Sequence, residues 1–312
     1  MEQLKINKKN ILLLLLLSII MITVLYFIFF NNKRFEPYGI KEKIILKNIK
    51  GENKYFIHGT FKVKSKCFLN STTEGMYIIP LDSNRKVLKD VQHLLFYAPF
   101  NGEDGTLAYK RYSWLRIFSE EHNFAIFSIR IKTDVDNVNN KYRYYIYKEA
   151  GWFDGILKIQ YFLQEKFNLP KNKLFAIGQS SGCSMIQRMA VDMPTKFAAV
   201  AGHGGSRFSK YFPNQKFPPA LFSSTCGDLT NIANRENFQN AINANIKLWY
   251  METVPKNNQD FHGASKQVFE VLTKFILSAK DNNLTQSSTF KQDFEKMPLF
   301  VYPWEKLKIF SN

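Results

Sequence analysis

The string Gly-Gln-Ser-Ser-Gly at residues 178–182 has the residue types and the spacing of a nucleophilic serine site. The apolar run 173–177 before it predicts a buried strand, and a helical period that includes Met185 follows at once. A sharp turn from strand to helix needs glycine on both sides, because side chains there would collide with neighbouring backbone. Such a turn raises the serine hydroxyl above the positive end of the helix. We therefore predict Ser180 as a nucleophile; the alternative is an ordinary glycine-rich turn with a capping serine.

A serine hydroxyl needs a base to accept its proton, and the usual base is a histidine oriented by a carboxylate. Only His203 and His262 follow Ser180 in the chain. His262 lies in a predicted loop between the apolar run 246–251 and the last helical period, where a base is expected on this kind of sheet. We predict His262 as the base, and we interpret His203 as part of a turn that lines the pocket.

The orienting carboxylate is expected on a loop after a strand that lies between the nucleophile and the base. Asp228 follows the apolar run 220–225 in a Gly-Asp turn, which matches that position. Asp260 is the alternative, but it stands only two residues before His262 and would reach the far nitrogen of the imidazole with difficulty. We predict Asp228 as the third catalytic residue.

An oxyanion formed by attack on a carbonyl carbon requires two backbone N–H donors. Ser181 supplies one by its position directly after the nucleophile. The second is expected from the loop Pro-Phe-Asn-Gly at residues 99–102, which follows the apolar run 93–98. We favour Phe100 as the donor, with Asn101 as the alternative.

Between these residues, short apolar runs alternate with stretches of helical periodicity. Near-continuous apolar runs are typical of strands that are buried on both faces of a parallel sheet. The predicted strands lie at 44–46, 55–63, 76–79, 93–98, 124–130, 173–177, 197–201, 220–225 and 246–251. Helical spacing runs through residues 156–167, 185–193 and 268–276. This order predicts an α/β fold with a mostly parallel central sheet and helices on both faces.

The stretch from about Leu94 to Ile276 resembles the α/β-hydrolase superfamily, and within it the polyhydroxybutyrate depolymerase-like and feruloyl or acetylxylan esterase-like enzymes. The likeness is carried by residues 114–129, by 151–170 with its Gly-Trp-Phe-Asp start and Asn-Leu-Pro end, by 174–185, and by 194–202. The family usually has His-Gly after its third strand, where this chain has Pro-Phe-Asn-Gly. Its acid loop commonly reads His-Gly-x-x-Asp, where this chain has Ser-Thr-Cys-Gly-Asp.

The resemblance implies a secreted or surface serine esterase with Ser180, Asp228 and His262 as its catalytic triad. We expect a small-molecule or polymeric ester substrate, and the proposed triad needs no metal or organic cofactor. A serine peptidase or acyltransferase on the same sheet remains an alternative, because the same triad serves other acyl donors and acceptors. A catalytically inactive binding module is the alternative from another class of protein.

The amino-terminal segment is strongly apolar. Residues 11–30 contain only Ser18 and Thr23 as plainly polar members, and a helix of that length spans roughly 30 Å, the thickness of a bilayer core. We expect an uncleaved transmembrane anchor with its amino end inside and the rest exported; a cleaved signal peptide is the alternative. The predicted organisation is a tail and anchor at 1–34, a catalytic domain at 35–280 with amino-terminal strands at 35–91, and an extension of unknown role at 281–312.

Composition limits the remaining possibilities. The 312 residues are 45% hydrophobic and 22% charged, which excludes a disordered or fibrous chain. The formal net charge is +17, and lysines crowd residues 41–66. We interpret the alternating run Phe-Lys-Val-Lys at 61–64 as a lysine-protected edge strand, with attraction to anionic lipid or an acidic polymer as the alternative. No nucleic-acid motif accompanies the charge, and the oligomeric state stays open.

Overall fold

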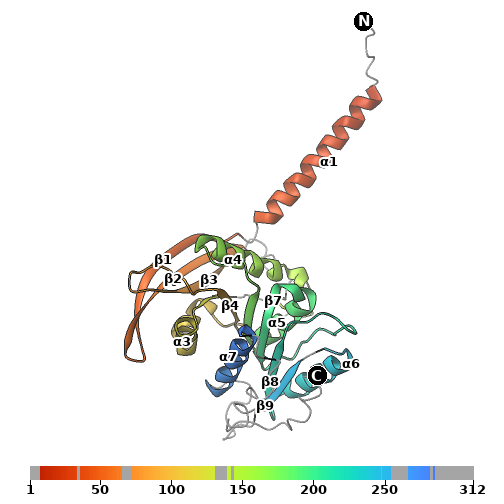
Figure 1. The fold of residues 1–312 in the computed structure, drawn as a ribbon. Helices are drawn as coiled ribbons and strands as arrows, with labels where there is room; N and C mark the ends of the chain where they lie inside the picture. The colour runs from red at the N-terminus through yellow and green to blue at the C-terminus, as the bar shows by residue number, and fades with distance from the viewer. Residues whose placement is uncertain are drawn as a thin grey trace.

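The computed structural model describes residues 8–33, 36–64, 72–130, 139–141, 144–246, 248–253, 266–281 and 284. A long helix, α1 (Lys8–Lys33), precedes the sheet and points away from it (Figure 1). The described side chains of α1, at residues 11–26, are almost all exposed. The remaining elements form one layered α/β body around a central sheet (Figure 1).

The sheet has nine strands in the order β1-β2-β3-β5-β4-β6-β7-β8-β9. Their bounds are β1 Tyr38–Ile49, β2 Glu52–Lys64, β3 Thr72–Leu81, β4 His93–Ala98, β5 Phe124–Ile129, β6 Leu174–Gln179, β7 Phe197–His203, β8 Ala220–Thr225 and β9 Trp249–Thr253. Strands β1, β2 and β3 pair antiparallel, as do β3 and β5. All pairings from β5 through β4 to β9 are parallel. The mostly parallel α/β sheet predicted from the alternation of strands and helices is confirmed.

Helices cover both faces of the sheet. Their bounds are α2 Ala108–Arg111, α3 Ser113–Glu121, α4 Trp152–Lys166, α5 Ser181–Asp192, α6 Thr230–Asn243 and α7 Lys266–Lys280. Figure 1 shows α3 and α7 on one side of the sheet, and α4, α5 and α6 on the other. The rings of Trp114 and Phe269 stack 4.7 Å apart and join α3 to α7. A short 3-10 helix, η1 (Gly105–Leu107), leads from the loop after β4 into α2.

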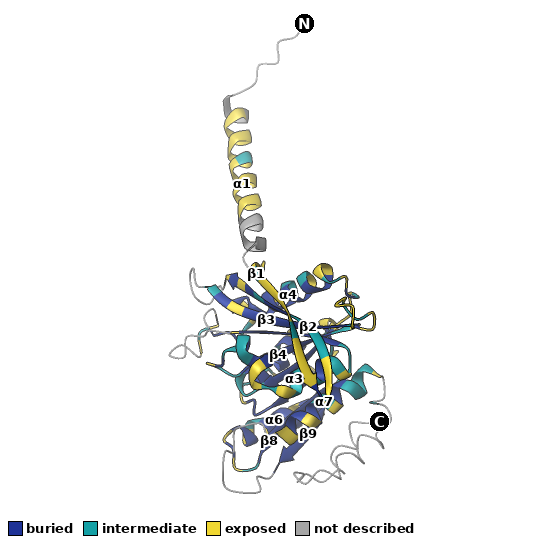
Figure 2. Cartoon of the chain, turned by 90° about the vertical axis from the view of Figure 1, so that its left-hand side faces the viewer, coloured by how far each residue is buried: buried dark blue, intermediate teal, exposed yellow. Residues whose placement is uncertain are grey.

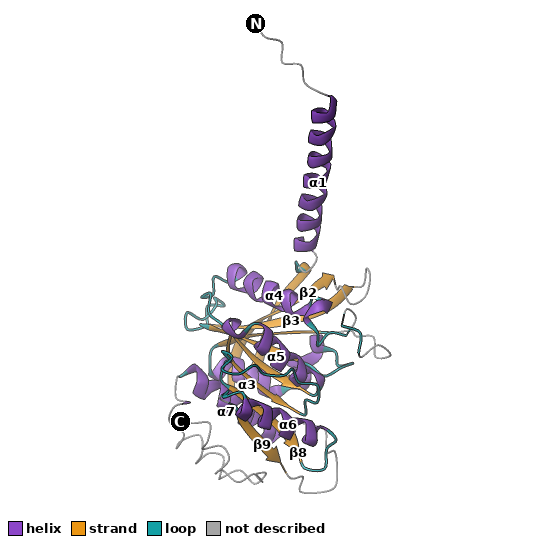
Figure 3. Ribbon diagram, turned by 90° about the vertical axis from the view of Figure 1, so that its right-hand side faces the viewer, coloured by secondary structure: helices purple, strands orange, loops and turns teal. Residues whose placement is uncertain are grey.

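The core follows from the character of the strands. Every residue of β5, β8 and β9 is buried, and β4 and β6 are buried but for one end residue each (Figure 2). Figure 3 shows these strands together with the helices of the layered body. Such strands have both faces under helices, so their sequences are continuously apolar. The edge strand β1 is exposed along most of its length and contains both apolar and charged residues.

Three predictions about strands need correction. The lysine-rich run 61–64 is not an edge strand, because it lies in β2 between β1 and β3. The edge is β1, which is far longer than the predicted strand 44–46 because its register with β2 continues from Ile49 back to Tyr38. Strand β9 begins at Trp249, three residues after the predicted start, because the N–H of Ile246 still donates to the carbonyl of Ala241 in α6.

Within the residues that the structure describes, no helix meets the length and apolarity needed to cross a membrane. The predicted carboxyl-terminal extension at 281–312 lies outside the described residues except for Asp281 and Leu284.

Candidate active site

Ser180 occupies the turn between β6 and α5 and has an unusual backbone conformation. Its φ of 53° and ψ of −125° are unfavourable for a residue with a side chain. Its backbone N–H donates to the carbonyl of His203 at 2.7 Å, and its carbonyl accepts from the N–H of Cys183 at 2.9 Å. The strained residue is therefore held from both sides, by the end of β7 and by the first turn of α5.

Two glycines allow this turn to form. A Cβ on Gly182 would lie 2.2 Å from the carbonyl oxygen of Ala98, and a Cβ on Gly178 would lie 2.6 Å from the backbone of Gly182. Helix α5 thus begins in direct backbone contact with the ends of β4 and β6. The physical reason for the predicted Gly-x-Ser-x-Gly pattern is visible in these contacts.

The loop at 99–102, which was predicted to carry the second oxyanion donor, is fastened to the turn. The N–H of Asn101 donates to the hydroxyl oxygen of Ser181 at 2.8 Å. The hydroxyl of Tyr145, a residue with no exposed surface, donates to the same oxygen at 2.6 Å. The side chain of Ser181 therefore joins the loop after β4 to a buried tyrosine, and the N–H of Asn101 is engaged in this contact.

Tyr145 was not predicted from the sequence as a residue of the site. Burial raises the pKa of its phenol above the ordinary value, while the bond to Ser181 acts in the opposite direction. The phenol is therefore neutral and keeps the proton that it donates. Its only sequence signal was a tyrosine-rich stretch before α4, which does not distinguish a core residue from one that reaches the site.

Asp228 follows β8 in the turn that leads to α6, and 8% of its surface is exposed. Its carboxylate accepts from the N–H of Thr230 at 3.1 Å and from the hydroxyl of the same residue. Strands β6 and β8 are separated by β7 alone, so the turns that carry Ser180 and Asp228 lie two strand spacings apart, roughly 10 Å. Because these strands are parallel, both turns stand at the same edge of the sheet.

The predicted base, His262, and the alternative acid, Asp260, lie outside the described residues. Their segment connects the end of β9 to the start of α7 in the chain. The assignment of both residues stays a prediction.

His203 differs from its predicted role in a pocket-lining turn. It is the last residue of β7, and its side chain is completely buried. One ring nitrogen lies 2.9 Å from the hydroxyl of Ser223, and the other lies 3.5 Å from the hydroxyl of Thr225. The imidazole therefore packs against β8, because the parallel pairing of β7 and β8 continues to this residue.

A second buried carboxylate, Glu252, lies at the end of β9 and was missed from the sequence. Its oxygens accept from Arg235 at 2.9 Å, from Tyr250 at 2.7 Å and from Asn231 at 2.9 Å. Burial disfavours its charge, but these donors hold the pKa of the carboxyl below the ordinary value. With its charge satisfied by Arg235, Glu252 ties the start of α6, next to Asp228, to β9.

Among the described residues, no group of three or more His, Cys, Asp or Glu side chains is arranged to hold a metal ion. Burial raises the pKa of Cys183, beside the serine turn, well above the ordinary value. Its thiol is therefore a packing group rather than a nucleophile.

Solved structures of distant sequence share this fold. An S-formylglutathione hydrolase from Agrobacterium tumefaciens matches with a TM-score of 0.54 at 11% identity, over 77% of this chain and 99% of that chain. One from Staphylococcus aureus gives 0.52 at 13% identity, over 78% and 98%. A ferulic acid esterase gives 0.53 at 13% identity, over 76% and 98%. No family model and no curated protein matches the chain. At such low identities, the likeness establishes a shared fold.

Proposed function

We propose that this chain, which has the α/β-hydrolase fold of those structures, is a serine hydrolase that cleaves carboxylic esters. The observation that carries the proposal is the strained backbone of Ser180 at the junction of β6 and α5, where the close backbone contacts of Gly178 and Gly182 leave no room for a side chain at either position. Backbone strain of this kind persists where it serves a site. The similar structures named as S-formylglutathione hydrolases and as a ferulic acid esterase support a hydrolase of this class.

In the proposed reaction, the hydroxyl oxygen of Ser180 attacks the acyl carbon while His262 accepts its proton. Asp228 holds the imidazole in the required tautomer and stabilises its positive charge. The proton then passes to the leaving alkoxide, which departs as an alcohol and leaves an acyl-enzyme. Water, activated by the same imidazole, releases the acid and restores the serine.

The backbone N–H of Ser181, at the start of α5, is the first proposed oxyanion donor, and Phe100 is the second. Phe100 is favoured over Asn101 because the N–H of Asn101 already donates to the Ser181 hydroxyl. The positive end of the α5 dipole adds to the stabilisation of negative charge at this position. Each such donor contributes roughly 3 kcal/mol to the transition state in serine hydrolases.

Labelling with a fluorophosphonate probe tests the nucleophile. The native protein is expected to form a covalent adduct that peptide mapping places on Ser180, and Ser180→Ala is expected to form none. Ser113→Ala is the matched control, because it removes an exposed hydroxyl at the start of α3. Undiminished labelling of folded Ser180→Ala would refute the assignment.

Substrate panels distinguish esterase activity from the alternatives. We expect turnover of p-nitrophenyl esters and little turnover of aminoacyl anilides, because an amide leaving group demands a better-placed proton donor. Preferred cleavage of the anilides would indicate a peptidase instead. A folded native protein without turnover on either panel, and without probe labelling, would indicate an inactive binding module.

We also propose that α1 anchors the protein in a membrane with its catalytic domain exported. The support is the exposure of large apolar side chains all along Ile11–Tyr26, from 45% at Ile11 to 69% at Leu12. Alkaline carbonate extraction tests this: the native chain should stay with the membrane, and Leu15→Lys with Ile20→Lys should release it. Each lysine raises the free energy of inserting the helix into the membrane by roughly 3 kcal/mol. The control pair, Ile44→Lys with Leu46→Lys, makes the same change at exposed positions of β1 and should not release the chain.

A further inference from the structure

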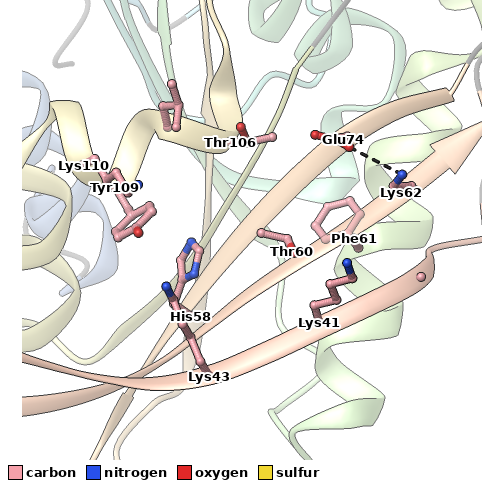
Figure 4. Close-up of a pocket in the computed structure, with 12 residues that line it drawn as sticks. Lys41, Lys43, His58, Thr60, Phe61, Lys62, Glu74, Thr106, Tyr109 and Lys110 are labelled. Carbon is pink, nitrogen blue, oxygen red and sulfur yellow. Dashed lines mark ion pairs between the residues drawn. The ribbon is translucent and has the colours of Figure 1, made fainter.

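A cavity of about 310 Å³ lies at the β1 side of the sheet, between strands β1, β2 and β3 and the segment from η1 to α2 (Figure 4). Its lining comes from β1, β2, β3, η1 and α2, and it includes Lys41, Lys43, Lys62 and Lys110. Strand β2 stands four strand positions from β6, which is roughly 19 Å. The cavity is therefore separate from the candidate active site.

The register of β1 and β2 builds the floor of this cavity. Alternate residues of a strand share one face, and here Lys43 lies opposite His58 while Lys41 lies opposite Thr60. The acidic residue between the two lysines, Glu42, faces the other side of the sheet, where it contacts Tyr77 and Lys166. The strand thus presents its positive charges to the cavity and its negative charge away from it.

The positive charges are largely uncompensated. Four lysines line the cavity against a single carboxylate, Glu74, which lies 3.6 Å from Lys62. Among the described residues, Lys41, Lys43 and Lys110 have no ion-pair partner. Lysines that gather around a hollow without counter-charge repel one another, and an anion in the hollow would relieve that repulsion.

A buried histidine, His58, also lines this cavity beside the exposed lysines. Only 6% of its surface is exposed, its ring packs 4.0 Å from that of Tyr109, and its Nε2 atom is buried without a hydrogen-bond partner in the described structure. A buried polar atom without a hydrogen-bond partner is uncommon, and a bound ligand is one explanation for it. Figure 4 shows the side chain of Lys43 beside the His58 ring, with Thr60 next along the strand.

We propose that this cavity binds a phosphate group, held by the ammonium groups of Lys41, Lys43 and Lys110 and by the imidazole of His58. A phosphate offers several acceptor oxygens and up to two negative charges, which suits a cavity lined by donors from β1, β2 and α2. The cavity has the volume of about ten water molecules. It therefore has room for the phosphate and for a small alcohol esterified to it, such as glycerol.

Two sources would present this group: a soluble phosphate ester, or the headgroup of an anionic lipid. The cavity includes Gly39, which lies six residues after the end of α1, so a headgroup is within reach if α1 is membrane-embedded. The chemistry of recognition is the same in both cases, and experiments on the full-length protein separate them.

The first experiment titrates full-length protein in a non-ionic detergent with inorganic phosphate and with glycerol 3-phosphate, using calorimetry. Lys43→Gln with Lys110→Gln is expected to weaken binding by about a hundredfold, because two charge-assisted contacts are lost. Lys47→Gln with Lys89→Gln removes the same charge at exposed positions outside the cavity, and it should leave the affinity within about threefold.

A second variant addresses the imidazole itself. His58→Phe keeps an aromatic ring against Tyr109 but removes the unpartnered nitrogen. It is expected to weaken phosphate binding by about tenfold without loss of the folded state, which circular dichroism would check.

A third experiment distinguishes a soluble phosphate ester from a lipid headgroup. It uses the full-length protein in nanodiscs that contain phosphatidylcholine alone or with phosphatidic acid. Hydrogen exchange of the peptide 106–111 is the readout, because this segment covers the cavity. Slower exchange with phosphatidic acid in the native protein, but not in Lys43→Gln with Lys110→Gln, assigns the site to a lipid headgroup. Slower exchange only when glycerol 3-phosphate is added assigns it to a soluble ester.

The proposal is overturned if none of the three phosphate ligands binds the native protein. It is also overturned if the two double variants lose affinity equally, since that would be a general effect of net charge.

Discussion

At the scale of single residues, the serine turn can form because two nearby glycines have no side chain. Gly178 and Gly182 provide space that a methyl group would fill, and Ser180 tolerates its positive φ because its neighbours hold it there. The turn could be predicted from the sequence because only glycine fits at positions 178 and 182, and that requirement is visible as residue type. The role of Ser181 as a hydrogen-bonded link was not readable, since any small polar residue satisfies the pattern.

Gly182→Ala tests this steric argument. The new Cβ would stand 2.2 Å from the carbonyl oxygen of Ala98, so the start of α5 or the end of β4 must move. We expect a loss of about 1–3 kcal/mol in the free energy of unfolding, as for overpacked cores, together with loss of probe labelling. Normal stability and normal labelling, measured by urea unfolding and gel fluorescence, would contradict the close contact.

Tyr145→Phe tests the link through Ser181. The substitution removes one hydrogen bond to the Ser181 hydroxyl and leaves the ring in place. If Tyr145 positions the loop that carries Phe100, kcat is expected to fall by about tenfold while KM changes little. A purely structural role would instead lower thermal stability and leave kcat of the folded enzyme unchanged.

At the scale of elements, the turn after β8 serves two purposes at once. Asp228 lies where an orienting carboxylate is expected, and its oxygens also accept from Thr230 in the first turn of α6. Glu252 fastens the same turn of α6 to β9 through Asn231. The predicted catalytic residue therefore also stabilises a helix start, a coupling that the one-dimensional pattern did not reveal.

Two substitutions at Asp228 separate these purposes. Asp228→Asn keeps an acceptor for the N–H of Thr230 but removes the charge and disturbs the tautomer of the proposed base, so activity should fall by about ten-thousandfold at nearly native stability. Asp228→Ala should lose the same activity and also about 1 kcal/mol of unfolding free energy. Full activity of Asp228→Asn on p-nitrophenyl esters would transfer the role to another carboxylate.

Edge and interior strands differed in how well their sequences predicted them. Strands β4 and β8 were predicted at the observed bounds, because continuous apolar runs mark strands covered on both faces. The edge strand β1 was predicted at a quarter of its length, because an exposed strand needs no apolar continuity. Its long register with β2 is a tertiary property, and it also creates the basic cavity.

At the scale of the whole molecule, one buried and two half-buried histidines make stability depend on pH. Burial, with the charges of Lys43 and Lys110, lowers the pKa of His58 to about 4. Burial also lowers the pKa values of His93 and His122, with smaller contributions from nearby charges. Below about pH 6.5 the unfolded chain binds protons that the folded chain does not, so folding stability falls as the pH falls toward 4.

Urea unfolding at pH 7.5 and at pH 5 measures this effect. The native protein should be less stable at pH 5, and His58→Phe should reduce the difference, by up to about 1.4 kcal/mol per pH unit crossed. An identical pH dependence in native protein and variant would show that His58 is not held neutral. With saturating sulfate, which does not titrate in this range, the contribution of His58 should shrink because an anion favours the protonated ring.

Local patterns in the sequence predicted the order of the strands, three of the helices between them, the mostly parallel sheet and the position of the serine turn. Those features follow from local rules: apolar periodicity, and the exclusion of side chains from a tight turn. Three features required the folded structure: which strand is the edge, the meeting of Asn101 and Tyr145 at Ser181, and the cavity that His58 lines together with lysines of β1, β2 and α2. These contacts join residues far apart in the chain, so they depend on strand register and packing, which residue types alone do not specify.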